Sequence, residues 1–331
     1  MRNTMNPRMN ITCAGLLLCL ATIPAIAQEA TTPAIDGVVA AGTPIQLVKE
    51  GFKATEGPVP MEDGGVLFTD NTANQIVRIA PDGSISPWIE NTGGANALTR
   101  APKAKGEVVA TLVGDKVIAA MKPGADRRVL AKEYEGKSFN RPNDIVASRR
   151  GNLYFTDTAA VGATNPALPS AVYQLTSKGK LLRIATDIAR PNGVALSPDE
   201  RTLYVANTSG EWIVAFDVDR KGGISAKHRD FARLVLPPPA APAAGATAPS
   251  GPPSSGADGI AVDAKGRLFV ATSVGVQVFA ADGKALGTIV LPKTPQNLAF
   301  AGPGLSSLYV VGRGAVYRIA TQTKGPDRAG K

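Results

Sequence analysis

Six polar residues whose side chains carry an oxygen acceptor recur at one position of a repeated pattern. Each stands about ten to fifteen residues before a short apolar segment, and the six are Glu56, Asn96, Asn143, Asn192, Asp258 and Gln296. Two carboxylates and several amide oxygens, with no Cys or His nearby, suit a hard divalent cation such as Ca²⁺ or Mg²⁺. Turn chemistry is the alternative, because Asn and Asp before Gly can hydrogen-bond their own backbone. Their occurrence in all six copies favours a shared site.

The apolar segments define an internal repeat. They are Leu67–Asp70, Val108–Thr111, Leu153–Asp157, Leu203–Ala206, Leu268–Ala271 and Leu308–Val311. Their starting positions differ by 41, 45, 50, 65 and 40 residues, and the longest interval contains the twenty-residue Pro/Ala-rich stretch 237–256. That stretch cannot form a core and is expected to be a flexible loop insertion, without which the interval is 45 residues.

Each repeat predicts four short strands separated by turn signals. In the fourth copy these strands are expected over Gly193–Leu196, Thr202–Ala206, Trp212–Val218 and Asp230–Leu236. Four strands in roughly 45 residues, with hardly any helical periodicity, are typical of a β-propeller blade. A linear β-solenoid would need shorter, more uniform repeats and terminal caps. The predicted fold is therefore all-β, a six-bladed β-propeller, in which the six polar positions converge on the central channel.

The ends of the repeat region indicate how the ring closes. The sixth copy supplies only three strands before polar residues follow, whereas Pro44–Glu50 belongs to no copy. We expect this N-terminal strand to complete the last blade and remove an open sheet edge. The propeller then spans residues 44–320, preceded by an N-terminal tail over 28–43 and followed by a disordered C-terminal tail over 321–331.

The first 27 residues have the features of a secretory signal peptide. Arg2 and Arg8 precede an apolar run from Ile11 to Ile23, and Ala25-Ile26-Ala27 forms a cleavage site. Both cysteines of the chain lie within this segment, so the mature chain is expected to fold without disulfides. The expectation is a periplasmic or secreted protein, monomeric and without a membrane anchor after cleavage.

Composition excludes several functions. His228 is the single histidine, which excludes three-His metal sites and any Ser-His-Asp triad built without it. His228 lies in a polar run between expected strands of the fourth blade and is predicted to be a surface residue. Without Arg2 and Arg8 the chain keeps 34 basic and 27 acidic residues, a net charge of +7. The basic residues are scattered without interleaved aromatics, so no nucleic-acid partner is predicted.

Several stretches resemble the SMP-30/gluconolactonase/luciferin-regenerating-enzyme family. They are EGPVP, ANALT, NRPNDIV, LYFTDT, RPNGVALSPDERTLYVA and ADGIAVDAKGRLFVA, in the family's order from about Glu56 to Ile319. The resemblance implies a six-bladed propeller with one divalent metal in its channel, often acting on lactones. It places the metal ligands at Glu56, Asn192 and Asp258, and substrate contacts at Arg141 and Asn143.

One departure from the family concerns the second blade. Bacterial gluconolactonase-like members often carry Cys-Glu-His after its inner strand, where this chain has Ala110-Thr111-Leu112-Val113. The pocket wall from this blade is therefore apolar and uncharged, while Asn96 of the same blade is kept. The metal set is unaffected by this difference, and a sugar lactone as the substrate is put in question.

The expected chemistry is metal-assisted hydrolysis of a lactone or related ester. The cation, Ca²⁺ in first place with Mg²⁺, Mn²⁺ or Zn²⁺ as alternatives, would polarise the carbonyl and the attacking water. Asp144 and Asp157 are the candidate general bases, with Asp144 preferred because it adjoins Asn143. Arg141 and Asn96 would orient substrate oxygens. The second function class is a non-catalytic propeller that binds a small ligand or protein and uses the metal only as a structural element.

Overall fold

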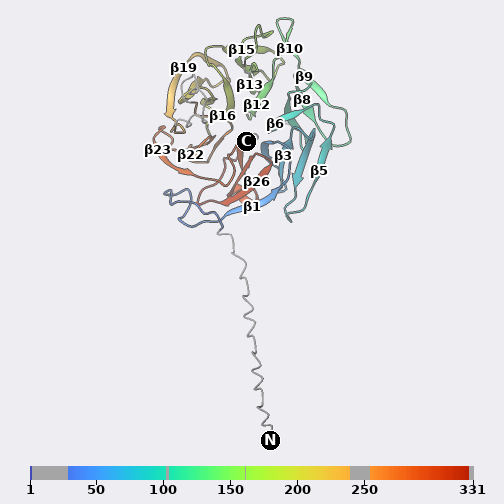
Figure 1. Ribbon diagram of the computed structural model, residues 1–331. Coiled ribbons are helices and arrows are strands. Elements are labelled where there is room, and N and C mark those ends of the chain that lie inside the picture. The colour runs from blue at the N-terminus through green and yellow to red at the C-terminus, as the bar shows by residue number, and fades with distance from the viewer. Residues whose placement is uncertain (2–28, 102–103, 161, 239–253, 328–331) are drawn as a thin grey trace.

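Six four-stranded antiparallel sheets surround a central axis in the computed structural model (Figure 1). The structure describes residues 1, 29–101, 104–160, 162–238 and 254–327. Within these ranges the only helical element is a single 3-10 turn, η1 (Pro303–Leu305). The predicted six-bladed β-propeller is thereby confirmed.

Within each of the first five blades the strands follow one another from the axis to the rim in chain order. Blade 1 contains β2 (Thr55–Pro60), β3 (Val66–Asp70), β4 (Gln75–Ile79) and β5 (Ile85–Glu90), and blade 2 contains β6 (Ala95–Arg100), β7 (Val108–Leu112), β8 (Val117–Met121) and β9 (Arg128–Ala131). Blade 3 contains β12 (Pro142–Ala147), β13 (Leu153–Asp157), β14 (Ala171–Leu175) and β15 (Leu181–Ala185), after a small hairpin of β10 (Glu133–Tyr134) and β11 (Lys137–Ser138). Blade 4 contains β16 (Pro191–Leu196), β17 (Thr202–Asn207), β18 (Trp212–Val218) and β19 (Ile224–Arg233), and blade 5 contains β20 (Ile260–Val262), β21 (Leu268–Thr272), β22 (Gly275–Phe279) and β23 (Ala285–Ile289).

The sixth blade is built from both ends of the chain. β24 (Asn297–Ala301), β25 (Ser307–Gly312) and β26 (Ala315–Ala320) come from the C-terminal side, and β1 (Ile45–Glu50) adds the outermost strand. β1 pairs antiparallel with β26, with Ile45 opposite Ile319. The N-terminal strand therefore closes the ring, as its position outside the repeat predicted.

Apolar side chains fill the spaces between neighbouring blades. The second strand of each blade is the apolar segment of the sequence repeat, and both of its faces are buried because a neighbouring blade covers each one. Phe139, Phe155 and Tyr173, for example, form a ring cluster with centroids 5.3–5.4 Å apart. This packing sets the position of every innermost strand.

A buried ion pair joins the fifth blade to both ends of the chain. The carboxylate of Asp263, which is fully buried, accepts bonds from Arg267 Nε at 2.6 Å and from Thr323 Oγ1 at 2.9 Å. Arg267 Nη2 also donates to the carbonyl of Gly37 at 2.8 Å. One guanidinium and one carboxylate thus hold the segments on either side of the propeller strands against blade 5.

The segment after β26 crosses the face of the propeller at which the innermost strands end. Gly325 N donates to Leu305 O in blade 6 and Ala264 N of blade 5 donates to Lys324 O. Arg149 Nη2 of blade 3 donates to Asp327 O at 3.0 Å. Because blades 3 and 6 are opposite in a ring of six, the segment spans the axis. Residues 321–327 therefore differ from the disordered tail expected there, because hydrogen bonds to three blades hold them.

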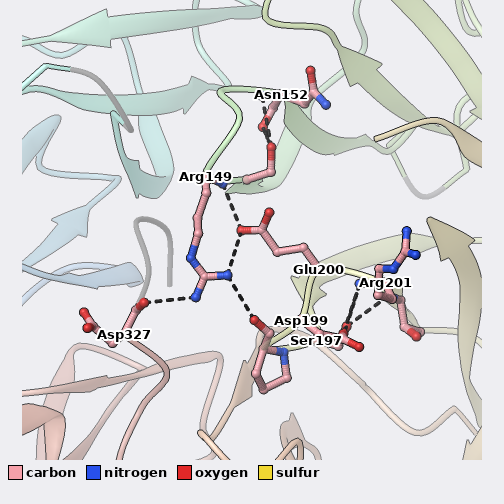
Figure 2. A network of polar contacts seen from close by, with 10 residues as sticks. Arg149, Asn152, Ser197, Asp199, Glu200, Arg201 and Asp327 are labelled. Carbon is pink, nitrogen blue, oxygen red and sulfur yellow. Dashed lines mark hydrogen bonds and ion pairs between the residues drawn. The ribbon is translucent and has the colours of Figure 1, made fainter. Parts of the chain in front are cut away.

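Figure 2 shows how Arg149 anchors this crossing. Its main-chain N donates to Glu200 Oε1 at 2.9 Å, and its Nη1 donates to Pro198 O at 3.1 Å. These contacts join the turn of blade 3 to the turn of blade 4 beside Asp327 (Figure 2). The guanidinium therefore makes structural contacts. It lies at the face of the propeller where the innermost strands end, opposite the face where they begin.

Other expectations fall on the rim or outside the described residues. His228 lies within the outermost strand β19 and not between strands, with Nε2 at 3.2 Å from Asp187 Oδ2 and its ring against Phe216. The predicted signal peptide over 1–27 and most of the insertion 237–256 lie outside the described residues. No helix in the described ranges is long and apolar enough to cross a membrane.

Replacing Arg267 with Ala should lower the free energy of unfolding by about 3–5 kcal/mol, because it leaves the buried Asp263 carboxylate without its charged partner. The exposed pair of Arg229 and Asp217 is the control, and Arg229→Ala should cost about 1 kcal/mol or less. Urea denaturation of the two variants and the parent protein measures both values. Equal losses of unfolding free energy for the two variants would show that the buried pair stabilises the fold no more than an exposed pair does.

Candidate functional site

The innermost strands bring the six predicted polar residues around the axis, each in contact with the next blade. Asn96 Nδ2 donates to Asn143 Oδ1 at 3.2 Å, and Gln296 Nε2 donates to Glu56 Oε1 at 3.3 Å. The main-chain N of Gly259, next to Asp258, donates to Gln296 O at 2.8 Å. Residues from five blades are thus linked directly at the start of the innermost strands.

Backbone bulges aim these side chains. The pairing of the first two strands shifts register between Glu56 and Val59 in blade 1 and between Ala95 and Leu98 in blade 2. The same shift follows Pro142 in blade 3 and Pro191 in blade 4. Such a bulge re-aims a side chain at the rim of a sheet. Asn and Glu at this position therefore belong to strands and not to turns, although Glu56 Oε2 also accepts from its neighbour Gly57 N at 3.1 Å.

Close approach of neighbouring strands explains the glycine that follows three of these residues. A Cβ on Gly193 would lie 2.0 Å from Asp258 O, and a Cβ on Gly57 would lie 2.4 Å from Asn96 O. Both distances are shorter than any real Cβ contact. The Glu-Gly, Asn-Gly and Asp-Gly pairs of the sequence thus combine a polar side chain with the room that the next blade needs.

Three threonines carry hydrogen bonds from one blade to the next. Thr69, Thr111 and Thr156 occupy the same place in the second strands of blades 1, 2 and 3. Their Oγ1 atoms donate to the carbonyls of Asn96, Asn143 and Asn192 respectively, each at 2.7 Å. These bonds fix the main chain of the polar residues from behind.

Asn192 presents an unsatisfied oxygen. Its Nδ2 donates to Thr208 Oγ1 at 3.1 Å, which orients the amide, yet its buried Oδ1 has no hydrogen-bond partner. Only two other buried side-chain polar atoms within the described ranges lack a partner. An oxygen left this way costs free energy unless a ligand satisfies it. The position therefore fits a cation ligand.

The other two predicted ligands lie in blade 1, opposite Asn192 in the ring, and at the start of blade 5, next to it. Glu56 is 6% exposed, and Asp258 is half-buried just before β20, where its main-chain N donates to Ala271 O. Two carboxylates and one orphaned amide oxygen form a donor set that suits a hard cation. Within the described residues no group of three or more His, Cys, Asp or Glu side chains could hold a metal. Any site here must rely on the amide.

Asp144 lies fully buried between blades 3 and 4. Its Oδ2 accepts from Val194 N at 2.9 Å and its Oδ1 from Ile145 N at 3.0 Å. The carboxylate thus sits between the strand that carries Asn143 and the strand that carries Asn192. This position is compatible with the predicted base, whose role stays a prediction.

Asp157 has a different surrounding. Its Oδ1 accepts from Arg141 N at 2.7 Å, and its Oδ2 accepts from both the main-chain and side-chain N of Asn140. Burial raises the pKa of the Asp157 carboxyl, and these hydrogen bonds oppose the shift. Asp70 holds Lys53 and Ala54 in the same way in blade 1. Asp157 therefore positions the segment entering β12, and a catalytic role for it remains untested.

The predicted substrate contacts are exposed toward the channel mouth to different extents. Arg141 is exposed, with its main chain anchored by Asp157, whereas Asn143 and Asn96 are half-buried and bonded to each other. Asn71 Nδ2 further contacts Asn96 Oδ1 at 3.5 Å. The three predicted residues therefore occupy adjacent blades 2 and 3.

Two site residues were missed by the sequence analysis. Thr208 orients Asn192 and donates to Ala257 O at 2.8 Å, and the buried Asn297 donates to Glu56 Oε2 at 3.0 Å. Thr208 follows the apolar repeat by two residues, and Asn297 follows Gln296. The sequence shows only that each of them is a polar residue close to a position of the repeat. It does not show which residue of another blade each one contacts.

Comparison with known proteins identifies similar chains. The model of the SMP-30/Gluconolactonase/LRE-like region matches residues 54–313. A gluconolactonase of Zymomonas mobilis is 30% identical over 321 residues, covering 89% of this chain and 86% of that protein. Regucalcin of Xenopus laevis is 29% identical, covering 80% and 84% respectively. The solved structure of a Xanthomonas campestris gluconolactonase has a TM-score of 0.72 at 26% identity, covering 88% and 94%.

Replacing Gly193 with Ala should lower the free energy of unfolding by about 1–3 kcal/mol, because its methyl group would press on the backbone of Asp258. Gly223→Ala is the control, since its Cβ would meet only the exposed Asp219 side chain, and it should cost about 0.5 kcal/mol or less. Urea denaturation measures both. A Gly193→Ala protein as stable as its parent would show that the inner strands are not closely packed.

Proposed function

The chain belongs to the SMP-30/gluconolactonase/LRE-like family, and on that basis we propose that it is a metal-dependent hydrolase that opens a lactone or a related ester. The gluconolactonase relatives support the reaction class. The residue chemistry of the channel supports a divalent cation, with Ca²⁺ proposed first and Mg²⁺, Mn²⁺ or Zn²⁺ as alternatives.

The observation that carries the metal proposal is the orphaned Oδ1 of Asn192. Thr208 holds the amide so that this oxygen, and not the nitrogen, stays without a protein partner. Glu56 and Asp258 supply the negative charge that a divalent cation requires. These three residues would hold the cation, which when bound would withdraw electron density from the lactone carbonyl.

The remaining polar residues would bind and orient the substrate. Arg141 offers a planar guanidinium that can donate two parallel hydrogen bonds to the oxygens of a lactone ring or of the product carboxylate. Asn143 and Asn96 are oriented by their mutual bond and present amide groups beside it. Such fixed donors reduce the entropy lost when the reacting groups are aligned.

Asp144 is the proposed general base. It lies between the strands of Asn143 and Asn192 and accepts hydrogen bonds from two main-chain amides. It would take the proton of the attacking water as the new C–O bond forms. It would return that proton to the ring oxygen as the ester C–O bond breaks, so that the leaving group is an alcohol and the product a carboxylic acid, which ionises in water.

The wall contributed by blade 2 bears on the substrate. Ala110, Thr111 and Leu112 are buried in β7, and Thr111 Oγ1 is already used between Ala97 N and Asn143 O. These side chains pack between the blades and offer the channel no charged group, so this segment of blade 2 supplies no charged contact for the hydroxyls of a sugar lactone. The same feature is the observation that favours the second candidate, a propeller that binds a small molecule without turning it over.

We propose that the protein acts outside the cytoplasm. The basis is the basic, apolar and small-residue pattern of residues 1–27. We propose that this segment is removed on export to the periplasm or the medium.

Lactone hydrolysis by the purified protein tests the proposal. A chelator-treated sample given Ca²⁺, Mg²⁺, Mn²⁺ or Zn²⁺ in turn should hydrolyse members of a lactone panel, and Asp258→Asn should lose the activity with its circular dichroism unchanged. Asp217→Asn is the control and should keep the activity, because this residue is an exposed position of the otherwise mostly buried strand β18. Tight metal binding without turnover of any lactone would favour the binding propeller.

Two conservative variants separate the candidate bases. Asp144→Asn should lower kcat by about 10²–10⁴-fold, because no group takes the proton from water. Its NH₂ group would also face the N–H of Val194 or Ile145, so the metal Kd and the melting temperature of this variant are measured beside kcat. Asp157→Asn places an amide NH₂ among the N–H donors of Asn140 and Arg141. It should therefore act mainly on KM, through a displaced Arg141, and on stability. Steady-state kinetics decide the assignment, and a kcat loss confined to Asp157→Asn would exchange the two roles.

A further inference from the structure

The residue that follows each of the six polar residues in the sequence differs between blades. Its type matches the groups that the neighbouring blade presents. It is Gly in blades 1, 4 and 5 and Ala in blade 2, but Asp144 in blade 3 and Asn297 in blade 6. Asp144 and Asn297 are both fully buried or nearly so, at 0% and 1% exposure. Both are polar side chains placed where the neighbouring strands are closest.

These two side chains have the same geometry toward their own strand. Asp144 Oδ1 accepts from Ile145 N at 3.0 Å, and Asn297 Oδ1 accepts from Leu298 N at 2.9 Å. The second terminal atom of each reaches the next blade. Asp144 Oδ2 accepts from Val194 N, whereas Asn297 Nδ2 donates to Glu56 Oε2 at 3.0 Å.

The residue type follows from what the next blade presents. Blade 4 offers an N–H donor, so the cross-blade atom in blade 3 is a carboxylate oxygen. Blade 1 offers the Glu56 carboxylate, so the cross-blade atom in blade 6 is an amide N–H. A carboxylate at position 297 would place two negative groups side by side. A flipped Asn297 amide would also lose both bonds, because its oxygen would face the Glu56 carboxylate and its NH₂ would face Leu298 N–H.

We infer that Asn297 is a positioning residue that holds Glu56 in the orientation required to bind the channel cation. The inference rests on the proposed metal site and extends it to a residue that is not among the three proposed ligands. Gln296 Nε2 contacts the other oxygen, Glu56 Oε1, at 3.3 Å. Blade 6 therefore grips both oxygens of the carboxylate, with the shorter and more deeply buried bond coming from Asn297.

The packing around Asn297 restricts the movement of its side chain and so fixes its bond to Glu56. A Cβ on Gly259 would lie 2.1 Å from Asn297 Oδ1, so the amide presses against the strand entry that carries Asp258. Gly259 N also donates to Gln296 O at 2.8 Å. Asn297 thus lies between two of the proposed ligands and fixes one of them directly. Partners of this kind set ligand orientation, and their loss typically weakens metal affinity by about 10–100-fold.

Isothermal titration of chelator-treated full-length protein with Ca²⁺ and with Mn²⁺ tests the inference. Asn297→Ala and Asn297→Leu, which keeps the branched heavy-atom outline of Asn without its polar atoms, should each raise the metal Kd by about 10–100-fold. Asn152→Ala is the matched control, since Asn152 is 5% exposed and its Oδ1 accepts from Ser177 N at 2.9 Å at the opposite end of the innermost strands. It should lower the metal-free melting temperature while the metal Kd stays that of the parent.

The outcomes distinguish the inference from the function that it extends. If the parent protein binds either cation and both Asn297 variants bind it equally well, Asn297 has only a structural role and the inference is wrong. If the parent protein binds neither cation, nor Mg²⁺ or Zn²⁺ in the same titration, the proposed metal site is wrong and the inference falls with it. Weakened binding in Asn297→Leu, whose side chain leaves no cavity, supports positioning over packing.

Discussion

Crowding at the axis is the constraint on which the site depends. Six innermost strands meet with so little space that a single methyl group at Gly193 would collide with the backbone of the next blade. Close approach of this kind excludes water and side chains from the strand contacts, so every polar group there needs a protein partner or a ligand. The result is a ring of hydrogen bonds in which the orphaned oxygen of Asn192 stands out.

Because of this crowding, a change of residue type at one backbone position gives each blade different hydrogen bonds to its neighbour. A shared backbone position carries Gly where a strand must pass, Asp144 where the neighbour offers an N–H, and Asn297 where it offers a carboxylate. The threonines of blades 1 to 3 support the channel from behind, and Ala206, Ala271 and Val311 take their place in blades 4 to 6. The chemistry of the channel is therefore asymmetric although the fold is repetitive.

Much of the fold could be predicted because the repeat is visible in one dimension. The spacing of the apolar strands predicted six blades, and the missing strand after Ile319 predicted that Pro44–Glu50 would close the ring. The polar position was found for the same reason. What the sequence did not reveal were partners: the amides that Asp157 holds, the bond from Asn297 to Glu56, and the contacts that order residues 321–327. Each joins segments far apart in the chain, so no local pattern records it.

Ring closure also dictates an order of events during synthesis. Ile45 is made early, and its partner Ile319 follows 274 residues later. Until then β1 has an unpaired edge, and the contacts that join the two ends must wait for the whole chain because they span nearly its full length. The first five blades can assemble one after another, whereas the sixth can form only after β26 has been made. The ring therefore stays open, and the inner edge of β1 stays unpaired, until β26 has been made.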